Sequence, residues 1–270
     1  MATLYMVATP IGNLEDMSLR AARVLGEVDT VACEDTRHTL KLLSHLGIRK
    51  PLVACHAQDE AKGSARILGI LAQGRDVAYC SDAGTPGISD PGVMAASLAR
   101  EAGHAVVPIP GPSALSALAS AAGLFFKSVT FDGFPSPKPG RRRARVAELM
   151  SRGEAFVMYE SPFRVLRLLG DIAGVDPGRQ VCVGREMTKI HEEFVRGTAS
   201  DVLAELSSRA DIKGELAVLV AGLPGKEVRK ARRAEAGRRG TGDADRAPGD
   251  ASRDGPDTDY DDDEEEEGDD

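Results

Sequence analysis

The sequence predicts an α/β protein with a parallel sheet in its N-terminal domain, a mixed sheet in its C-terminal domain and a disordered C-terminal tail. Up to about residue 124, short apolar runs alternate with longer amphipathic stretches, the pattern of a parallel sheet flanked by helices. Further on, two strand-like runs follow each other without a helix between them, which is typical of a hairpin in a mixed sheet. Beyond residue 223 the apolar periodicity ends.

The first half of the chain contains five short apolar runs that predict buried strands, at residues 4–9, 30–34, 51–56, 77–81 and 105–109. Four amphipathic stretches between them predict helices, at residues 19–25, 39–46, 61–72 and 93–102. The last three are followed closely by Gly47, Gly74 and Gly103. Glycine ends a helix well because it adopts the left-handed conformation without a Cβ penalty.

The second half predicts strands at residues 129–134, 155–160, 180–186, 192–196 and 215–221, with helices at 141–151, 163–172 and 199–208. We place the domain boundary within residues 112–128 and assign no element to that stretch. The resulting division is an N-terminal domain of residues 1–115, a C-terminal domain of residues 116–224 and a tail of residues 225–270.

The composition favours a globular protein and argues against a membrane-spanning or secreted one. A chain of 270 residues with 42% hydrophobic content can bury a substantial core. No apolar run approaches the roughly 20 residues of a membrane-spanning helix, and the N-terminus has no secretory pattern. Cys33, Cys55, Cys80 and Cys182 form no CxxC pair, which argues against a zinc knuckle or a disulfide framework. We therefore expect a cytoplasmic protein.

The formal charge of −8 is concentrated in the tail, because residues 226–270 hold nine Lys and Arg against seventeen Asp and Glu. The first 225 residues are formally neutral, so the net charge does not argue against a nucleic-acid partner. The tail is basic at first and then acidic, and it has too few apolar residues to offset its ordering entropy. We expect it to be disordered, as a solubilising segment or as a binding segment.

Three glycine- and proline-rich loops follow predicted strands, at residues 9–13, 81–92 and 108–114. Parallel α/β sheets place ligand crevices at the carboxyl ends of their strands. A single such loop is more often an ordinary turn, but three at one edge of a sheet predict a pocket. None matches GxGxxG or a Walker A sequence, so the pattern does not favour a dinucleotide or ATP site.

Charged residues cluster after other strands, at residues 34–37, 56–60 and 184–193. Such clusters form polar active sites or, alternatively, surface ion pairs that contribute little. His56 and His191 have no recognisable metal-ligand spacing, so we expect no metal. A further basic run, residues 136–145, includes Arg141, Arg142 and Arg143 and leads into a helix. Arginine suits phosphate, which predicts an RNA contact, and the alternative is a solvated helix face.

Six motifs together resemble the ribosomal RNA small subunit methyltransferase I family of the tetrapyrrole methylase superfamily. The resemblance covers roughly residues 3–223 in order. The motifs are Val-Ala-Thr-Pro-Ile-Gly-Asn-Leu at 7–14, Glu-Asp-Thr-Arg at 34–37, Ser-Asp-Ala-Gly-Thr-Pro-Gly-Ile-Ser-Asp-Pro-Gly at 81–92, Pro-Gly-Pro-Ser-Ala at 110–114, Tyr-Glu-Ser-Pro at 159–162 and Arg-Glu-Met-Thr-Lys-Ile-His-Glu at 185–192.

The resemblance implies a two-domain tetrapyrrole-methylase-like fold that binds S-adenosylmethionine between its domains and forms a homodimer. It also implies 2′-O-methylation of a cytidine in the decoding region of 16S ribosomal RNA, free or in the small ribosomal subunit. By analogy, the cofactor contacts are Pro10, Asp82, Gly84, Thr85, Ser113, Ala114, Tyr159 and Leu216. The sequence departs from the family at residues 56–60, which lack the usual second histidine, and at Phe163, where a histidine is usual. Neither replaced histidine is then essential for catalysis in this chain.

A ribose hydroxyl is a weak nucleophile that a nearby carboxylate or amine could deprotonate. We favour Glu186 and Lys189 for this role, with Glu34 and Asp35 as further candidates. Arg37 and Arg185 join the arginines at 141–143 as expected RNA contacts. Two alternatives stay open: a small-molecule, tetrapyrrole-type methyltransferase, and a non-catalytic ribosome-binding protein that keeps the loops only as structure.

Overall fold

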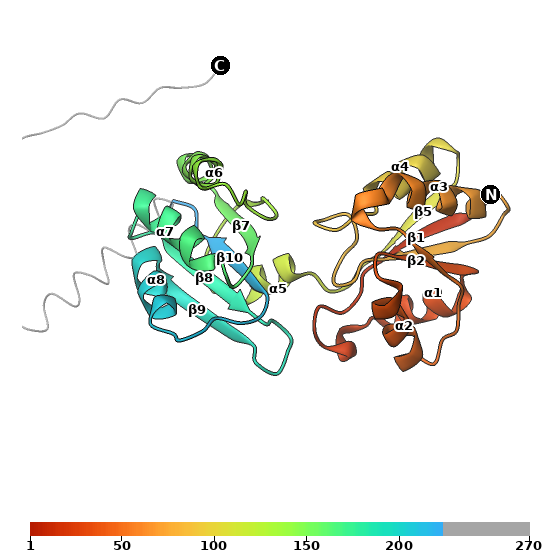
Figure 1. The fold of residues 1–270 in the computed structure, drawn as a ribbon, viewed down its shortest axis with the longest axis horizontal. Helices are drawn as coiled ribbons and strands as arrows, with labels where there is room; N and C mark the ends of the chain where they lie inside the picture. Colours follow the sequence, from red (N-terminus) through yellow and green to blue (C-terminus); the bar gives the residue numbers. More distant parts are fainter. Residues whose placement is uncertain (224–270) are drawn as a thin grey trace, which may run out of the picture. The chain divides into compact units, whose positions relative to one another are not determined.

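The first sheet has five parallel strands in the order β3-β2-β4-β1-β5 (Figure 1). It belongs to a computed structural model that describes residues 1–223. The strands are β1 (Thr3–Val7), β2 (Thr30–Cys33), β3 (Leu52–Ala54), β4 (Val77–Cys80) and β5 (Ala105–Ile109). β2 and β4 are buried along their whole length. Apolar residues on both faces are what a parallel sheet covered by helices requires.

Four helices and two 3-10 turns connect these strands: α1 (Leu19–Glu27), α2 (Thr36–His45), α3 (Glu60–Leu71), α4 (Val93–Glu101), η1 (Leu14–Asp16) and η2 (Ala57–Asp59). One core cluster joins α1 and α2 to one face of the sheet, and another joins α3 and α4 to the opposite face. Side chains fix where α1 and α2 begin. Ser18 accepts a hydrogen bond from the Ala21 amide, and Asp35 accepts one from the Arg37 amide.

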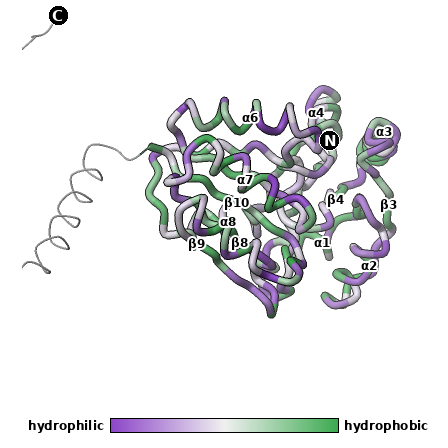
Figure 2. Tube along the Cα trace, turned by 60° about the vertical axis from the view of Figure 1, so that its left-hand side comes forward, coloured by the Kyte–Doolittle hydropathy of each residue, from purple (hydrophilic) through white to green (hydrophobic). Residues whose placement is uncertain are grey.

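The second sheet has the order β6-β7-β10-β8-β9 and is mixed, since β6 runs parallel to β7 and the other pairs are antiparallel. Its strands are β6 (Val129–Phe131), β7 (Ala155–Glu160), β8 (Gln180–Arg185), β9 (Glu193–Thr198) and β10 (Leu216–Val220). The predicted hairpin is β8 and β9. The helices α6 (Pro139–Ser151), α7 (Val165–Val175) and α8 (Ala199–Ser207) share one core cluster with this sheet. Figure 2 shows hydrophilic and hydrophobic residues alternating along α6, as an amphipathic helix requires.

A helix that the sequence analysis did not assign, α5 (Ala114–Ala121), lies within the predicted boundary stretch. Leu118 and Ala122 pack it against Val157 of β7, Cys182 of β8 and Leu219 of β10. The segment consists of alanine, leucine and serine, which are compatible with a helix. It therefore covers the face of the second sheet opposite α7, rather than serving as an open linker.

The predicted fold class is confirmed: a parallel sheet comes first in the chain and a mixed sheet second. The division at residue 115 stays a prediction, because Met1–Leu223 forms a single compact unit by contacts. The predicted disordered tail, residues 225–270, lies outside the described residues. Among residues 1–223, no helix is long and apolar enough to cross a membrane.

Candidate functional site

The glycine-rich loop at 81–92 is pinned to the loop that follows β1. Thr9 and Gly84 exchange two backbone hydrogen bonds of 2.9 and 3.0 Å. The Ser81 hydroxyl donates to the Gly84 carbonyl at 2.9 Å, and the Thr85 hydroxyl donates to the Pro112 carbonyl at 3.1 Å. Gly84 has φ of 82°, a conformation that L side chains rarely adopt. The three loops predicted to form a pocket are thus joined into one framework.

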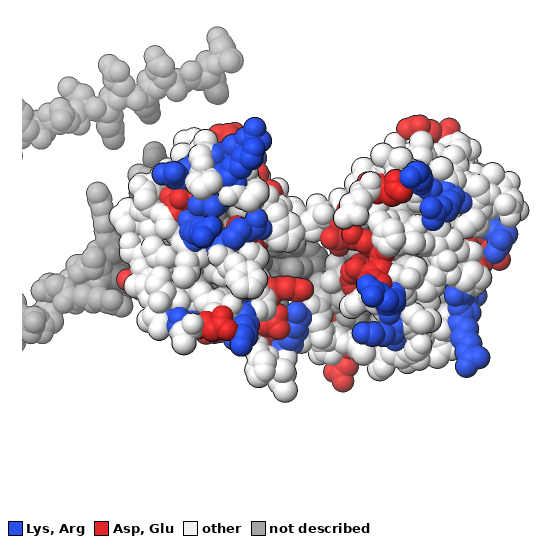
Figure 3. All heavy atoms as spheres, viewed as in Figure 1, with Lys and Arg blue, Asp and Glu red and all other residues white. Residues whose placement is uncertain are grey.

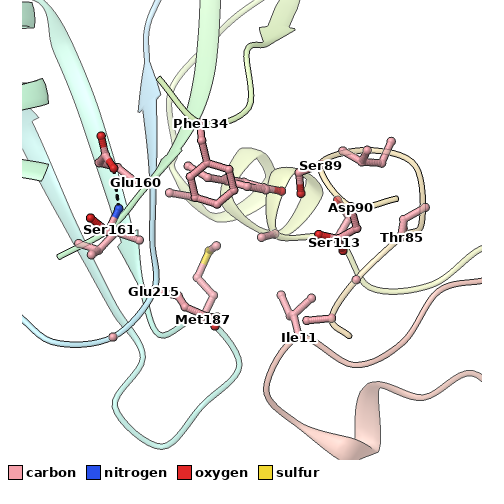
Figure 4. Close-up of a pocket in the computed structure, with 18 of the residues that line it drawn as sticks. Ile11, Thr85, Ser89, Asp90, Ser113, Phe134, Glu160, Ser161, Met187 and Glu215 are labelled. Atoms are coloured by element: carbon pink, nitrogen blue, oxygen red, sulfur yellow. Dashed lines mark hydrogen bonds between the residues drawn. The ribbon is translucent and has the colours of Figure 1, made fainter. Parts of the chain in front are cut away.

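A cavity of about 350 Å³ opens beside this framework, and we call it the first cavity. Figure 4 shows Ile11, Met187 and Phe134 pointing into it from different segments. Its volume lies within the ~300–1,000 Å³ typical of pockets for small molecules and cofactors. The other lining residues are Ala83, Gly84, Thr85, Ile88, Ser89, Asp90, Ser113, Ala114, Tyr159, Glu160, Ser161, Pro162, Gly214, Glu215, Leu216 and Ala217.

Tyr159 at the end of β7 connects this cavity to α5. Its hydroxyl accepts a hydrogen bond of 2.9 Å from the Leu115 amide in the first turn of the helix, where amides lack intrahelical partners. Burial raises the pKa of the Tyr159 phenol, so the group stays neutral at physiological pH. Phe131 and Phe134 meet its ring edge-on, with centroids 4.8 and 5.7 Å away. These contacts give the cavity a rigid aromatic wall.

The charged side chains that line the first cavity are all acidic. Glu160 is paired with Arg164 at 2.8 Å and Glu215 with Lys189 at 3.2 Å, whereas Asp90 has no ion-pair partner within residues 1–223. Burial raises the pKa of Asp90 to about 6, with the charges of Glu34 and Asp82 adding to the shift. An acid-lined cavity with apolar walls suits an organic cation with an apolar body.

The turn after β8 has an unusual backbone. Glu186 and Thr188 have φ of 48° and 67°, in the left-handed region that residues other than glycine seldom occupy. The Glu186 carboxylate holds the turn by accepting hydrogen bonds from the Glu215 amide at 2.9 Å and the Lys189 ammonium at 2.8 Å. This conformation places Met187 against the first cavity. Such strain, held by surrounding contacts, is frequent at functional sites.

The electrostatics of this turn do not favour Glu186 and Lys189 as general bases. The hydrogen bond from Lys189 lowers the pKa of Glu186. Burial lowers the pKa of Lys189, but the contacts with Glu186 and Glu215 outweigh it and the net shift is upward. The two groups therefore form an ion pair at neutral pH, in which the ammonium has no free electron pair to accept a proton. Their contacts fit a positioning role for the turn.

We predict that Glu186→Ala loosens this turn, because the Glu215 amide loses its acceptor and the strained backbone loses its main support. Amide hydrogen exchange at residues 187–189 should accelerate, and the free energy of unfolding should fall by about 1–3 kcal/mol. The matched control is Glu215→Ala, which removes only the 3.2 Å partner of Lys189 and leaves the Glu186 contacts in place. Equal exchange in the two variants would show that Glu186 does not hold the turn.

A second cavity, of about 260 Å³, shares the walls Ile11, Ala83 and Glu215 with the first. Unlike the first, it is lined by side chains that can carry positive charge: His38, Lys41 and Lys189. Its remaining residues are Thr9, Pro10, Gly12, Leu14, Leu42 and Asp82. We call it the second cavity.

The structure brings most of the predicted cofactor residues together. Gly84, Thr85, Ser113, Ala114, Tyr159 and Leu216 all line the first cavity. Pro10 and Asp82 line the second cavity instead. Asp82 accepts a hydrogen bond of 3.0 Å from the Asp35 amide, which ties the loop after β4 to the loop after β2.

Glu34 and Asp35, the other catalytic candidates, line neither cavity. Asp35 caps α2, and hydrogen bonds from the Arg37 side chain and amide lower the pKa of Asp35 to about 2. A carboxylate with so low a pKa is a weak base. Glu34 lies close enough to Asp90 for its charge to raise the pKa of that carboxyl.

The predicted RNA-binding arginines differ in their environments. Arg141 and Arg143 are exposed on α6, where Figure 3 shows Lys and Arg gathered. Arg37 is 87% exposed and paired with Asp35, and Arg185 is half-buried and paired with Glu193.

Arg142 requires a correction. It is buried, and its Nε lies 2.6 Å from the Asp171 carboxylate of α7. A guanidinium committed to a buried ion pair is not available to phosphate. We therefore assign Arg142 to the packing of α6 on α7 and remove it from the expected RNA contacts.

Asp90, Met187 and Phe134 are among the residues of the first cavity that were not candidates from sequence. Asp90 and Met187 lie inside motifs that were singled out, so their neighbourhood was predictable although their roles were not. Phe134 is 59% exposed and carries no sequence pattern that indicates a ligand. Within residues 1–223, no group of three or more His, Cys, Asp or Glu residues is placed to hold a metal ion.

The chain is similar to known methyltransferases in sequence and in fold. Residues 3–203 match the family model of tetrapyrrole (corrin/porphyrin) methylases. A protein of Borrelia garinii subsp. bavariensis named ribosomal RNA small subunit methyltransferase I is 45% identical over 218 residues, which are 80% of this chain and 97% of that protein. A protein of the same name from Pseudomonas aeruginosa is 44% identical over 240 residues, 87% of this chain and 84% of that protein.

Solved structures show the same fold at low sequence identity. Cobalt precorrin-4 methyltransferase, a cobalamin biosynthetic enzyme, has a TM-score of 0.59 at 15% identity and covers 81% of this chain and 94% of its own. Uroporphyrin III C-methyltransferase from Thermus thermophilus has a TM-score of 0.58 at 19% identity, with 84% and 99% covered. The loop motifs, the two sheets and the extent of the sequence match agree, and the chain belongs to the ribosomal RNA small subunit methyltransferase I family of tetrapyrrole methylases.

Proposed function

We propose that this chain methylates the ribose 2′-oxygen of a cytidine in the decoding region of 16S ribosomal RNA. The observation that carries the proposal is the acid-lined first cavity, which adjoins a second cavity whose lining includes Lys41 and Lys189 beside Asp82 and Glu215. The names of its relatives support a ribosomal RNA substrate. We further propose that it acts in the cytoplasm, as a homodimer, on free RNA or on the small ribosomal subunit.

S-adenosylmethionine is the methyl donor of this family. The first cavity fits it chemically. Asp90 offers a negative charge to a cationic group, and the Thr85 and Ser113 hydroxyls offer hydrogen bonds. Ile11, Met187 and Leu216 offer apolar surface for a planar base. When bound, the cofactor supplies a methyl group on a positively charged sulfur, which keeps both bonding electrons when the methyl group leaves.

The protein's contribution to such a transfer is mainly positioning, because a sulfonium methyl is already activated. The hydrogen-bonded framework of Thr9, Gly84 and Thr85 fixes the loop that borders the first cavity. The turn held by Glu186 fixes Met187, which lines the same cavity. A ribose oxygen that approaches from the second cavity would meet walls with little freedom to move, so less entropy is lost in reaching the reactive arrangement.

The exposed arginines of α6 are proposed to contact RNA phosphates. The double variant Arg141→Ala/Arg143→Ala should bind small-subunit RNA more weakly at low salt. The slope of log K against log salt should decrease in magnitude by about 1.4–1.8, for two lost phosphate contacts. Arg23→Ala serves as the control, since this exposed arginine of α1 is paired with Glu27. An unchanged slope would show that Arg141 and Arg143 lie on a solvated helix face and do not contact RNA phosphates.

Methyl transfer from labelled S-adenosylmethionine tests the proposed function against its alternatives. We expect incorporation into 16S RNA or small subunits, and resistance of the modified linkage to alkaline hydrolysis, since a 2′-O-methyl group blocks that cleavage. Incorporation into porphyrin precursors instead would favour a tetrapyrrole-type enzyme. Binding to small subunits with no incorporation into any acceptor would favour a non-catalytic ribosome-binding protein.

A further inference from the structure

We propose that the second cavity holds the acceptor ribonucleotide, with Lys41 of α2 binding a phosphate beside the ribose that is methylated. This inference rests on the proposed function and specifies where its acceptor lies. It concerns residues that the sequence analysis assigned to the cofactor, Pro10 and Asp82, and one that it did not single out, Lys41.

The second cavity lies next to the first. The two cavities share Ile11, Ala83 and Glu215, so they adjoin, and a group in one lies close to a group in the other. Methyl transfer requires donor and acceptor to meet without intervening protein. We place this contact at the edge where the two cavities adjoin, beside Ile11, Ala83 and Glu215.

The two cavities differ in the charge of their lining side chains. The charged residues that line the first cavity are acidic, whereas the second contains His38, Lys41 and Lys189 along with Asp82 and Glu215. Lys189 is already paired with Glu186 and Glu215. Lys41 is exposed and has no ion-pair partner within residues 1–223. Of the two lysines of this cavity, Lys41 is therefore the one whose ammonium is available to an incoming phosphate.

The second cavity combines apolar and cationic side chains. Pro10, Leu14 and Leu42 give it apolar surface next to the cationic side chains. A nucleotide combines the same two features, a flat base and a charged phosphate. Gly12 lies tightly against Lys189, so that a Cβ at this position would collide with the lysine side chain. The backbone of the loop after β1 therefore closes one side of the cavity.

His38 lies one turn before Lys41 on α2, and both line the same cavity. Residues three apart on a helix lie on neighbouring parts of its surface. Arg37 also projects from the first turn of α2 but is paired with Asp35. Hence α2 presents two neighbouring hydrogen-bond donors, His38 and Lys41, to the second cavity, and we assign phosphate binding to Lys41.

Two variants test the proposal by independent means. Lys41→Glu reverses the charge that faces the phosphate, and Leu14→Trp fills the cavity without changing charge; Leu14 is 44% exposed and tolerates a larger side chain. The control is Lys62→Ala, an exposed α3 lysine paired with Asp59 and absent from both cavities. Each full-length variant is assayed for methylation of small subunits and of 16S RNA, and for S-adenosylmethionine affinity by calorimetry.

The expected result is a KM for RNA at least about tenfold higher in both variants, equivalent to about 1.4 kcal/mol, with S-adenosylmethionine affinity unchanged and Lys62→Ala like wild type. A cytidine trinucleotide that inhibits wild type competitively with RNA should inhibit both variants less. Wild-type KM and trinucleotide inhibition in both variants would overturn the proposal, as would equal loss of cofactor affinity. Wild-type protein that methylates no RNA would instead overturn the proposed function itself.

Discussion

Arg142→Ala is expected to lower the free energy of unfolding by about 3–5 kcal/mol, the cost of leaving a buried charge without its partner. Arg142 and Asp171 have side chains only 5% and 13% exposed, and their closest atoms are 2.6 Å apart. The pair joins α6 to α7 at the edge of the core of the second sheet. Removing the arginine strands the Asp171 carboxylate in a site with little water. Urea denaturation followed by circular dichroism measures the loss.

Neighbouring arginines supply the control for this prediction. Arg141→Ala and Arg143→Ala change exposed residues of the same helix and should shift stability by no more than about 0.5 kcal/mol. The double variant Arg142→Met/Asp171→Leu replaces the pair by apolar groups and should recover most of the loss. If Arg142→Ala were as stable as Arg141→Ala, the ion pair would contribute nothing to the packing of α6 on α7.

The helical spacing of the buried residues in α6 distinguishes Arg142 from Arg141 and Arg143, although all three carry the same charge. Arg142, Val146 and Leu149 recur at helical spacing and are all buried. The apolar periodicity of α6 therefore extends to the arginine, whose position on the core face outweighs its charge. Residue type predicts a chemical group that can bind phosphate, whereas the direction in which that group points depends on the face of the helix it occupies.

The loops of the site were predictable for a related reason. Parallel strands end at one edge of a sheet, so loops after β1, β4 and β5 must come together there. What the sequence did not predict is which side of a loop faces which cavity, and so Pro10 and Asp82 line the second cavity rather than the first. The conformation of the turn at Glu186 was still harder to predict from the sequence. Its left-handed backbone depends on an acceptor for the Glu215 amide, 29 residues away in the chain.

Asp90→Asn is expected to weaken S-adenosylmethionine binding at pH 7.5 by about 10- to 100-fold, the range for losing a hydrogen bond or contact to a charged group. Asp90 is the acidic residue of the first cavity without a cationic partner within residues 1–223. The charges of Glu34 and Asp82 add to the rise in the pKa of Asp90, and the neighbouring Ser81 and Ser89 side chains oppose that rise. Asp59→Asn, which changes an exposed acid paired with Lys62, is the matched control for calorimetry.

The pH dependence of binding gives the same assignment a second test. Since burial raises the pKa of Asp90 to about 6, only a minority of the free protein carries this charge at pH 5.5. A bound cation favours the ionised form, so wild-type affinity should be about fourfold lower at pH 5.5 than at pH 7.5. In Asp90→Asn this contribution to the pH dependence should disappear. An equal decline in the variant would assign the titration to another group.

The raised pKa also has a consequence for stability without cofactor. A carboxyl whose pKa is higher in the folded protein than in the unfolded chain stabilises the fold below the unfolded value of 3.8, and this contribution is lost as the pH rises through about 6. Asp90→Asn should therefore make the cofactor-free protein more stable at pH 7.5, by about 1 kcal/mol once solvent screening of a partly exposed group is included. The same substitution should weaken cofactor binding. If the charge of Asp90 serves cofactor binding, its removal should raise the free energy of unfolding and lower the affinity for the cofactor. If the charge instead stabilised the fold, its removal would lower both quantities.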